Sequence, residues 1–178
     1  ITITAVFDLL CDLNVTSELP DGTAQPGVTV DGATYGGTTP YNFTVIRGGT
    51  VIDLQVNSAF KRRSIGGVTY DFAYWKLNGA QQGTSDRLTF PIATQPTNAV
   101  AVYKALRSFS VGSTDGATAG AINGVTITSS PNGYGGTTQY VVGTNVYDGD
   151  TFSLTAPDTW PAVAPVYNFD RWQINGVD

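Results

Sequence analysis

The sequence repeats itself at an interval of about one hundred residues. The segment 70–79 reads YDFAYWKLNG and returns as 167–176, which reads YNFDRWQING. The shorter segments 5–7, 27–30 and 35–39 also have counterparts, displaced by 96 to 99 positions and arranged in the same order. Several matches in one order indicate that the chain contains one structural unit twice.

Each unit is predicted to consist of short β-strands. Only Glu18 among the 14 acidic residues is a glutamate, and helix surfaces usually carry many Glu and Lys side chains. In the first unit we expect strands near 13–17, 27–31, 41–46, 50–56, 68–77, 87–92 and 98–104. The first five are expected again near 106–112, 124–129, 138–143, 151–156 and 166–175.

The expected fold class is all-β, with two tandem immunoglobulin-like β-sandwich domains. Seven strands in about a hundred residues, separated by turns, are typical of that sandwich. A β-grasp unit is the alternative, and it requires a helix that the sequence does not show. The predicted domains are an N-terminal strand at 1–8, one sandwich at 9–105 and a second, incomplete sandwich at 106–178.

The tryptophan strand carries the strongest core signal. Trp75 and Leu77 have the same parity along an extended strand, so both are expected to face the core. Phe72 has the opposite parity, which predicts a bulge between Phe72 and Trp75, or a sheet covered on both faces. A surface platform that stacks sugars is the alternative role for these aromatic side chains.

The two predicted units are out of phase with the chain. Its first residues, 1–7, match the closing strand 98–104 of the first unit, whereas nothing after Gly176 corresponds to residues 80–104. We therefore expect a donor strand, which would complete the second unit of a neighbouring copy and give a head-to-tail homopolymer. The expected donor side chains are Ile1, Ile3, Ala5 and Phe7, and the expected acceptor side chains are Phe169, Trp172 and Ile174.

Two other interpretations fit the same mismatch. The chain could be a stretch of a longer tandem-repeat stalk or adhesin that binds a glycan or a protein ligand, or an accessory module of an exported enzyme. The absence of methionine shows that Ile1 is not an initiator residue. It predicts either a removed leader or an origin within a longer chain.

Composition argues against several functions. The net charge of −5 disfavours nucleic acid as a partner, because phosphate binding needs clustered positive charge. No apolar stretch is long enough to span a membrane. The chain has no histidine, which excludes Ser-His-Asp and Cys-His catalysis and histidine-bound zinc. We expect no enzymatic activity and no cofactor, and Cys11 is expected to be a buried thiol or to form an intermolecular disulfide.

Three polar features remain. Asp148 and Asp150 flank Gly149 and are a weak candidate for a calcium site, because two carboxylates could bind a hard cation. Turn formation is the alternative explanation for most of the Asp-Gly pairs. The basic run 61–63 is expected to be a solvated loop or to meet an acidic neighbouring subunit. Asn14-Val15-Thr16 and Asn42-Phe43-Thr44 are sequons for N-glycosylation, although such triplets also arise by chance in a threonine-rich chain.

The motif Tyr-x-Phe-x-x-Trp-x-x-Asn-Gly, followed downstream by Ala-Val-Tyr, resembles the divergent repeats of bacterial and archaeal surface proteins grouped with the internalin B repeat. The resemblance covers most of both units. It implies an extracellular stalk, adhesin or interaction module without chemistry of its own, and it transfers no functional residue.

Overall fold

The structure is a computed structural model that describes residues 4–93, 95–143, 145–162 and 164–177. The chain divides into two compact units, unit 1 at 1–106 and unit 2 at 107–178. Within the described residues the regular structure is β-strand, apart from one 3-10 helix, η1 (Ser58–Phe60). The prediction of an all-β chain is therefore confirmed.

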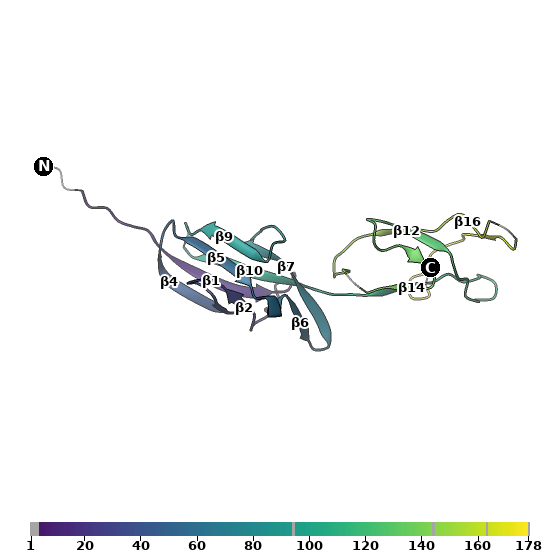
Figure 1. The fold of residues 1–178 in the computed structure, drawn as a ribbon, viewed down its shortest axis with the longest axis horizontal. Coiled ribbons are helices and arrows are strands. Elements are labelled where there is room, and N and C mark those ends of the chain that lie inside the picture. The colour runs from purple at the N-terminus through teal and green to yellow at the C-terminus, as the bar shows by residue number, and fades with distance from the viewer. Residues whose placement is uncertain (1–3, 94, 144, 163, 178) are drawn as a thin grey trace. The chain divides into compact units, whose positions relative to one another are not determined.

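Unit 1 is built from two sheets (Figure 1). The larger sheet has the order β4-β1-β10-β7-β6, with β8 paired to β7. Its strands are β1 (Leu10–Glu18), β4 (Tyr41–Arg47), β6 (Arg62–Ile65), β7 (Val68–Leu77), β8 (Ala80–Gln81) and β10 (Thr97–Ala105). The smaller sheet, β3-β2-β5-β9, contains β2 (Thr29–Asp31), β3 (Gly37–Thr38), β5 (Val51–Val56) and β9 (Arg87–Pro91).

Alternating side chains from both sheets form one core in unit 1. Along β1 the odd-numbered positions 11 to 17 are buried and the even ones are not, as expected for a strand with one face on a core. Leu13 of the larger sheet and Leu54 of the smaller one belong to the same buried cluster. This arrangement is that of a β-sandwich; its assignment to the immunoglobulin-like class remains a prediction.

β10 lies in the middle of the larger sheet. It runs parallel to β1 on one side and antiparallel to β7 on the other. Its pairing with β7 shifts register, because Val102 faces Tyr74 whereas Tyr103 faces Phe72. The extra residue, Ala73, confirms the predicted bulge, which explains why Phe72 and Trp75 both pack in the core region.

The strands expected in unit 1 correspond to β1, β2, β4, β5, β7, β9 and β10. The sequence did not predict β3, β6 and β8, which have two to four residues each. Such segments show little hydrophobic periodicity and form because a longer neighbour supplies the hydrogen-bond partners.

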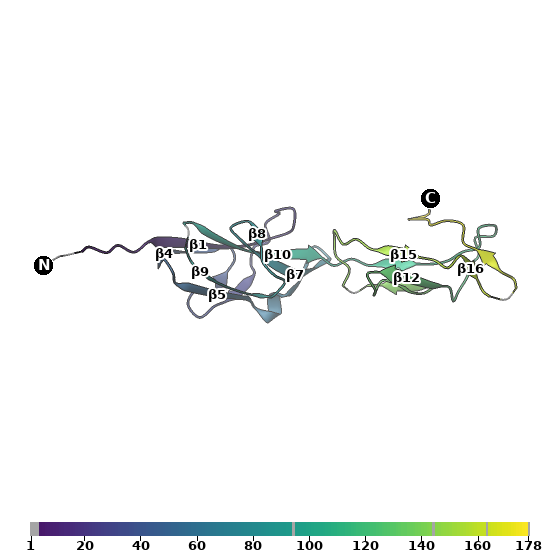
Figure 2. The ribbon, with the colours of Figure 1, turned by 90° about the horizontal axis from the view of Figure 1, so that it is seen from above.

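Unit 2 contains shorter strands at equivalent positions, and Figure 2 shows β12 beside β15. The pairs are β11 with β14, β12 with β13 and β15, and β16 with β17. Their bounds are β11 (Phe109–Val111), β12 (Thr126–Ser130), β13 (Gly136–Thr137), β14 (Tyr140–Val142), β15 (Ser153–Thr155), β16 (Thr159–Trp160) and β17 (Tyr167–Asn168). Of the long strand expected at 166–175, only β17 forms regular strand structure.

A buried hydroxyl cluster recurs in both units. In unit 1, Thr39 Oγ1 lies 2.7 Å from Ser17 Oγ and accepts a hydrogen bond of 3.0 Å from the Val28 backbone N–H. In unit 2, Thr138 Oγ1 makes the same contacts with Ser113 Oγ at 2.7 Å and the Val125 N–H at 3.2 Å. The sequence repeat is therefore also a repeat of hydrogen bonding.

The N-terminal strand expected at 1–8 is not formed as regular structure in the described part of that segment. Residues 4–9 carry no strand assignment and are exposed, and the chain extends away from the sheets of unit 1 before Asp8 in both views (Figures 1 and 2). Ile1 and Ile3 lie outside the described residues. An isolated extended segment gains no backbone hydrogen bonds, so it becomes a strand only when a neighbouring strand is available.

Candidate functional site: an open apolar groove in unit 2

The groove occupies the position that β10 fills in unit 1. There, β10 separates β1 from β7. By the repeat, β11 corresponds to β1 and residues 167–174 correspond to 70–77 of β7. Among the described residues of unit 2, no strand pairs with β11 on that side, and none corresponds to β9. Unit 2 therefore lacks a central strand within the described chain.

Equivalent side chains differ sharply in exposure between the two units. Trp75 is 0% exposed, whereas its counterpart Trp172 is 38% exposed. Ile174, the counterpart of the half-buried Leu77, is 77% exposed. Because Phe169 is exposed as well, the core-forming face of the tryptophan segment is open to solvent in unit 2.

Apolar side chains from several strands line the groove. Its cavity has a volume of about 1220 Å³ and is bounded entirely by residues of unit 2. The lining includes Phe109, Val111, Ile127, Leu154, Trp160 and Trp172. An exposed apolar surface of this kind marks an interaction site or an aggregation-prone surface.

Aromatic rings order one wall of the groove. Phe109 of β11 stacks on Phe152 with a centroid separation of 4.8 Å, and Tyr134 contacts the same Phe152 ring at 4.8 Å. On the tryptophan segment, Phe169 and Trp172 lie 5.5 Å apart. These contacts hold side chains in place without closing the groove.

The sequence predicted Phe169, Trp172 and Ile174 as groove residues but not Phe109, Phe152 and Trp160. Phe109 is the counterpart of Leu13 and Phe152 is the counterpart of Ile52, and both unit 1 residues are fully buried. Aligning the alternating core positions of the first unit with the second would have identified these two. Trp160 belongs to β16, a two-residue strand for which periodicity gave no signal.

The described part of the N-terminal segment 1–8 presents exposed apolar side chains. Val6 is 85% exposed and Phe7 is 91% exposed, and Ala5 is exposed too. The segment meets unit 1 only from Asp8 onward among its described residues: Arg47 Nε lies 3.1 Å from Asp8 Oδ2. Immediately after it, the Gly48 N–H donates a 2.7 Å hydrogen bond to the Leu9 carbonyl.

The acidic turn proposed for calcium is occupied by protein contacts. Arg107 Nε donates a hydrogen bond of 2.6 Å to Asp148, which holds the pKa of that carboxyl below its usual value. Asp150 accepts a 2.8 Å hydrogen bond from the Tyr147 backbone N–H. Within the described residues no three His, Cys, Asp or Glu side chains gather as metal ligands, so this turn offers poor support for a cation.

Other Asp-Gly pairs form turns, as the sequence predicted. Asp21 accepts a 2.9 Å hydrogen bond from the Thr23 N–H, and Asp115 accepts one of 2.9 Å from the Ala117 N–H. These hydrogen bonds lower the pKa of both carboxyl groups. Their positions are explained by Asx turns rather than by acid-base chemistry.

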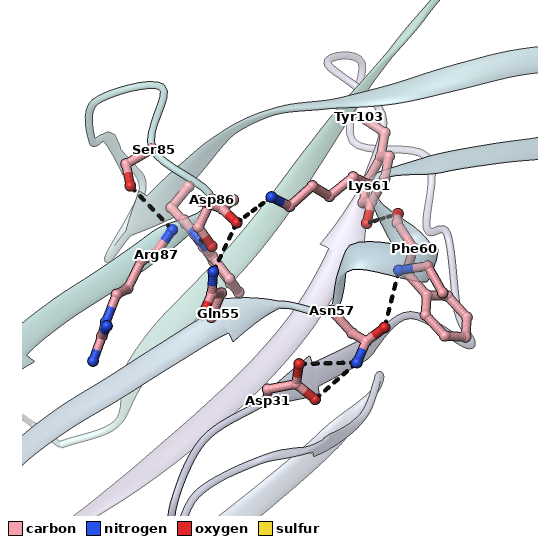
Figure 3. A network of polar contacts seen from close by, with 11 residues as sticks. Asp31, Gln55, Asn57, Phe60, Lys61, Ser85, Asp86, Arg87 and Tyr103 are labelled. Atoms are coloured by element: carbon pink, nitrogen blue, oxygen red, sulfur yellow. Dashed lines mark hydrogen bonds and ion pairs between the residues drawn. The ribbon is translucent and has the colours of Figure 1, made fainter.

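The basic run 61–63 is paired within unit 1. Lys61 Nζ lies 2.7 Å from Asp86, Arg62 Nε lies 2.6 Å from Asp71, and Arg63 donates a 3.1 Å hydrogen bond to the Pro26 carbonyl. Figure 3 shows Lys61 reaching across to Asp86. Carboxylates of unit 1 therefore pair with Lys61 and Arg62, whereas Arg63 contacts backbone carbonyls.

The two sequons lie on the larger sheet of unit 1. Asn14 on β1 is half-buried, and Asn42 on β4 is exposed. Cys11, also on β1, is a free thiol with its side chain fully buried, so an intermolecular disulfide would require unit 1 to open.

No protein-family model matches the chain, and no curated protein or solved structure matches it significantly. The resemblance to surface repeats therefore stays a hypothesis based on the motif alone. In the described part of the chain, no helix has the length and apolar character needed to cross a bilayer.

Proposed function

We propose that this protein is the structural subunit of an extracellular filament, in which the N-terminal segment of one copy completes unit 2 of the next. The observation that carries this proposal is the exposure of Trp172 in unit 2, whereas its counterpart Trp75 in unit 1 is fully buried on a strand paired with β10. The same chain therefore contains an open apolar groove in unit 2 and an N-terminal segment whose sequence resembles β10.

The match is one of sequence and of burial pattern. Ala5-Val6-Phe7 aligns with Ala101-Val102-Tyr103 of β10, all three of which are buried. In the same alignment Ile1 and Ile3 take the places of Thr97 and Ala99. These larger side chains bring apolar volume to a unit that has no described counterpart of β9, whose core residues in unit 1 include Phe90.

The alignment also gives the register of the complex. The donor segment would lie parallel to β11 and antiparallel to residues 167–174, as β10 lies between β1 and β7. Val100 of β10 pairs with Lys76 of β7. Thr4 of the donor is therefore paired with Gln173 of the acceptor.

Burial supplies the driving force. Covering one large apolar side chain contributes about 1.5–3 kcal/mol, so Val6 and Phe7 together contribute about 3–6 kcal/mol. Trp172, Phe169 and Ile174 of the acceptor lose exposed area in the same step. Backbone hydrogen bonds along both edges of the donor add directionality, as in other complexes formed by strand addition.

A filament follows because the interface is head-to-tail. Each copy has one donor segment and one acceptor groove, which are different surfaces. When two copies bind, one keeps its groove and the other keeps its donor segment available for a further copy. The proposed role is mechanical, without catalysis or cofactor. We interpret each completed unit as an immunoglobulin-like sandwich.

A paired-cysteine experiment tests the register. In a Cys11→Ala background, Thr4→Cys and Gln173→Cys are introduced together. Directly opposed residues of antiparallel strands have Cα atoms about 4.5–5.5 Å apart, which a disulfide can bridge. We expect mild oxidation to give a ladder of covalent oligomers on a non-reducing gel.

The matched control pairs Thr4→Cys with Ser64→Cys, an exposed position on β6 of unit 1, and should give no ladder above background. Sedimentation of the chain without residues 1–8 is the second arm. Assembly that continues without this segment, or equal ladders from both cysteine pairs, would contradict the proposal. A chain that stays monomeric would favour the stalk or adhesin interpretation.

A further inference from the structure

Two N-glycosylation sequons lie on adjacent strands of the larger sheet of unit 1, and their surroundings differ. Asn14 and Asn42 are direct Cα partners in the antiparallel pairing of β1 with β4. Their side chains leave the same face of the sheet, about 4.5–5.5 Å apart at Cβ. Two bulky oligosaccharides at this spacing would compete for the same space.

The side-chain amides of the two asparagines differ in their contacts. Asn14 Nδ2 donates a 3.0 Å hydrogen bond to Asn98 Oδ1 on β10, the strand on its other side. Asn98 is held in turn, because its backbone N–H donates a 2.8 Å hydrogen bond to Asn78 Oδ1. The Asn42 amide is exposed and makes no hydrogen bond to any described residue.

The backbones of the two sequons differ as well. β1 is hydrogen-bonded to β4 on one side and to β10 on the other, so presenting Asn14 in an enzyme's active site means breaking two ladders. β4 is at the edge of the sheet and pairs only with β1 among the described strands. An edge strand can be lifted at a lower free-energy cost than a central one.

An irregularity in β4 lies within the second sequon. The register between β1 and β4 shifts so that Thr44 and Val45 together oppose Asp12. Val45 has a φ of 64°, a left-handed conformation that is unfavourable for a β-branched residue. The ladder is therefore already interrupted at Thr44, the hydroxyl residue that an oligosaccharyltransferase must bind.

We infer that Asn42 is the N-glycan acceptor of the folded protein and that Asn14 is shielded. The co-reactant is a lipid-linked oligosaccharide. The bond from sugar C1 to the lipid phosphate oxygen breaks, a bond from C1 to Asn42 Nδ2 forms, and the lipid phosphate leaves with the bonding electron pair. One Nδ2 proton passes to a base of the enzyme.

A glycan at Asn42 would also protect the protein. The outer edge of β4 presents backbone groups that could pair with another chain, and edge strands are often blocked against such pairing. The inference requires export to a glycosylating compartment, but it does not depend on filament assembly. Glycosylation and assembly can therefore fail independently.

The test uses the folded chain, a lipid-linked oligosaccharide and an oligosaccharyltransferase chosen because it modifies both synthetic peptides 10–18 and 38–46. Glycopeptide mass spectrometry should show occupancy at Asn42 at least about tenfold above that at Asn14, because opening β1 is the costlier step. N42Q should abolish modification of the folded chain, and the matched control N14Q should leave it unchanged. Equal occupancy, preference for Asn14, or a folded chain that is not modified at all would overturn the inference.

Discussion

Tyr103 of β10 donates a hydrogen bond of 2.8 Å from its hydroxyl to the backbone carbonyl of Phe60, at the end of η1 (Figure 3). The bond ties the central strand of unit 1 to a segment outside its own sheet. The aligned position of the N-terminal segment is Phe7, which has no hydroxyl. Replacing Tyr103 by phenylalanine therefore isolates this bond while keeping the ring.

We expect Tyr103→Phe to lower the free energy of unfolding of unit 1 by about 0.5–1.5 kcal/mol, the usual contribution of one intramolecular hydrogen bond. The edge-on contact of the ring with Phe72, at 5.9 Å between centroids, remains in the variant. Urea unfolding of unit 1 measures the change. An unaltered midpoint would mean that the hydroxyl is equally well satisfied by water.

The same tyrosine predicts a dependence on alkaline pH. Burial raises the pKa of Tyr103 to about 12, and burial also raises the pKa of Tyr41. In the unfolded chain a tyrosine pKa is about 10. The stability tied to the neutral phenols is fully present below pH 10 and is lost as the pH rises toward 12.

Unit 1 should therefore unfold more readily at each step from about pH 10 to about pH 12, and Tyr103→Phe should lose less stability over that interval than the wild type. Denaturant midpoints measured across the interval provide the comparison. Parallel curves for the two proteins would show that Tyr103 does not titrate during unfolding.

At acid pH we expect Asp86 to contribute. Hydrogen bonds from Gln55 at 3.0 Å and from Lys61 lower the pKa of its carboxyl (Figure 3). A lowered pKa gives stability that is present above the unfolded value of 3.8 and is lost as the pH falls through the folded value.

Asp86→Asn should therefore flatten the loss of stability below about pH 4. The variant keeps the Asp86 backbone carbonyl, which accepts a 3.0 Å hydrogen bond from Trp75 Nε1. Thermal unfolding from neutral pH down to the acid limb measures the difference. A variant that loses stability as steeply as the wild type would assign the acid response to other carboxylates.

The repeated hydroxyl cluster gives a paired prediction. Thr39→Val in unit 1 and Thr138→Val in unit 2 each leave a buried backbone N–H without its acceptor. Each change also removes one hydrogen-bond contact of a serine hydroxyl, which keeps its bond to a backbone carbonyl. Each change should cost about 1–3 kcal/mol in its own unit. The neighbouring Thr38→Val is the control, because Thr38 is exposed and should change stability by less than about 0.5 kcal/mol. Equal losses of unfolding free energy from Thr39→Val and Thr138→Val would show that the cluster contributes equally to the stability of both units.

The sequence predicted the strands of unit 1 well because alternation and turn residues are local properties. β5 alternates clearly, and Trp75 and Phe72 together revealed a bulge that the pairing of β7 with β10 confirms. The strand expected at 166–175 was mostly wrong as regular structure, since only β17 forms. Its apolar pattern is intact, but a strand needs a partner in the position of β10, and that requirement is not local.

Of the candidate site, the sequence identified the tryptophan face but not the opposite wall of the groove. Phe109 and Phe152 come from segments whose own periodicity is too short to show which face they present. The pairing of Asn14 with Asn42 was equally hidden, because it depends on the register of two strands 28 positions apart along the chain.

A self-completing variant is the most direct consequence of the proposed assembly. Residues 1–8 are removed from the front of the chain and attached behind unit 2 through a flexible linker as long as segment 78–96, which makes the same connection from β7 to β10 in unit 1. The segment then competes at high effective concentration for its own groove. We expect a monomer whose unit 2 melts more than about 10 °C higher than in the chain that merely lacks residues 1–8, since burying Val6 and Phe7 contributes several kcal/mol.

The matched control carries Val6→Asp and Phe7→Asp in the attached segment, which keeps the linker and the segment length. Burying an unpaired carboxylate is strongly unfavourable, so the control should melt like the chain without the segment. Differential scanning calorimetry and light scattering separate the two effects, melting temperature and assembly. Equal melting temperatures for the graft and its control would mean that Val6 and Phe7 do not enter the groove, and the filament would need another interface.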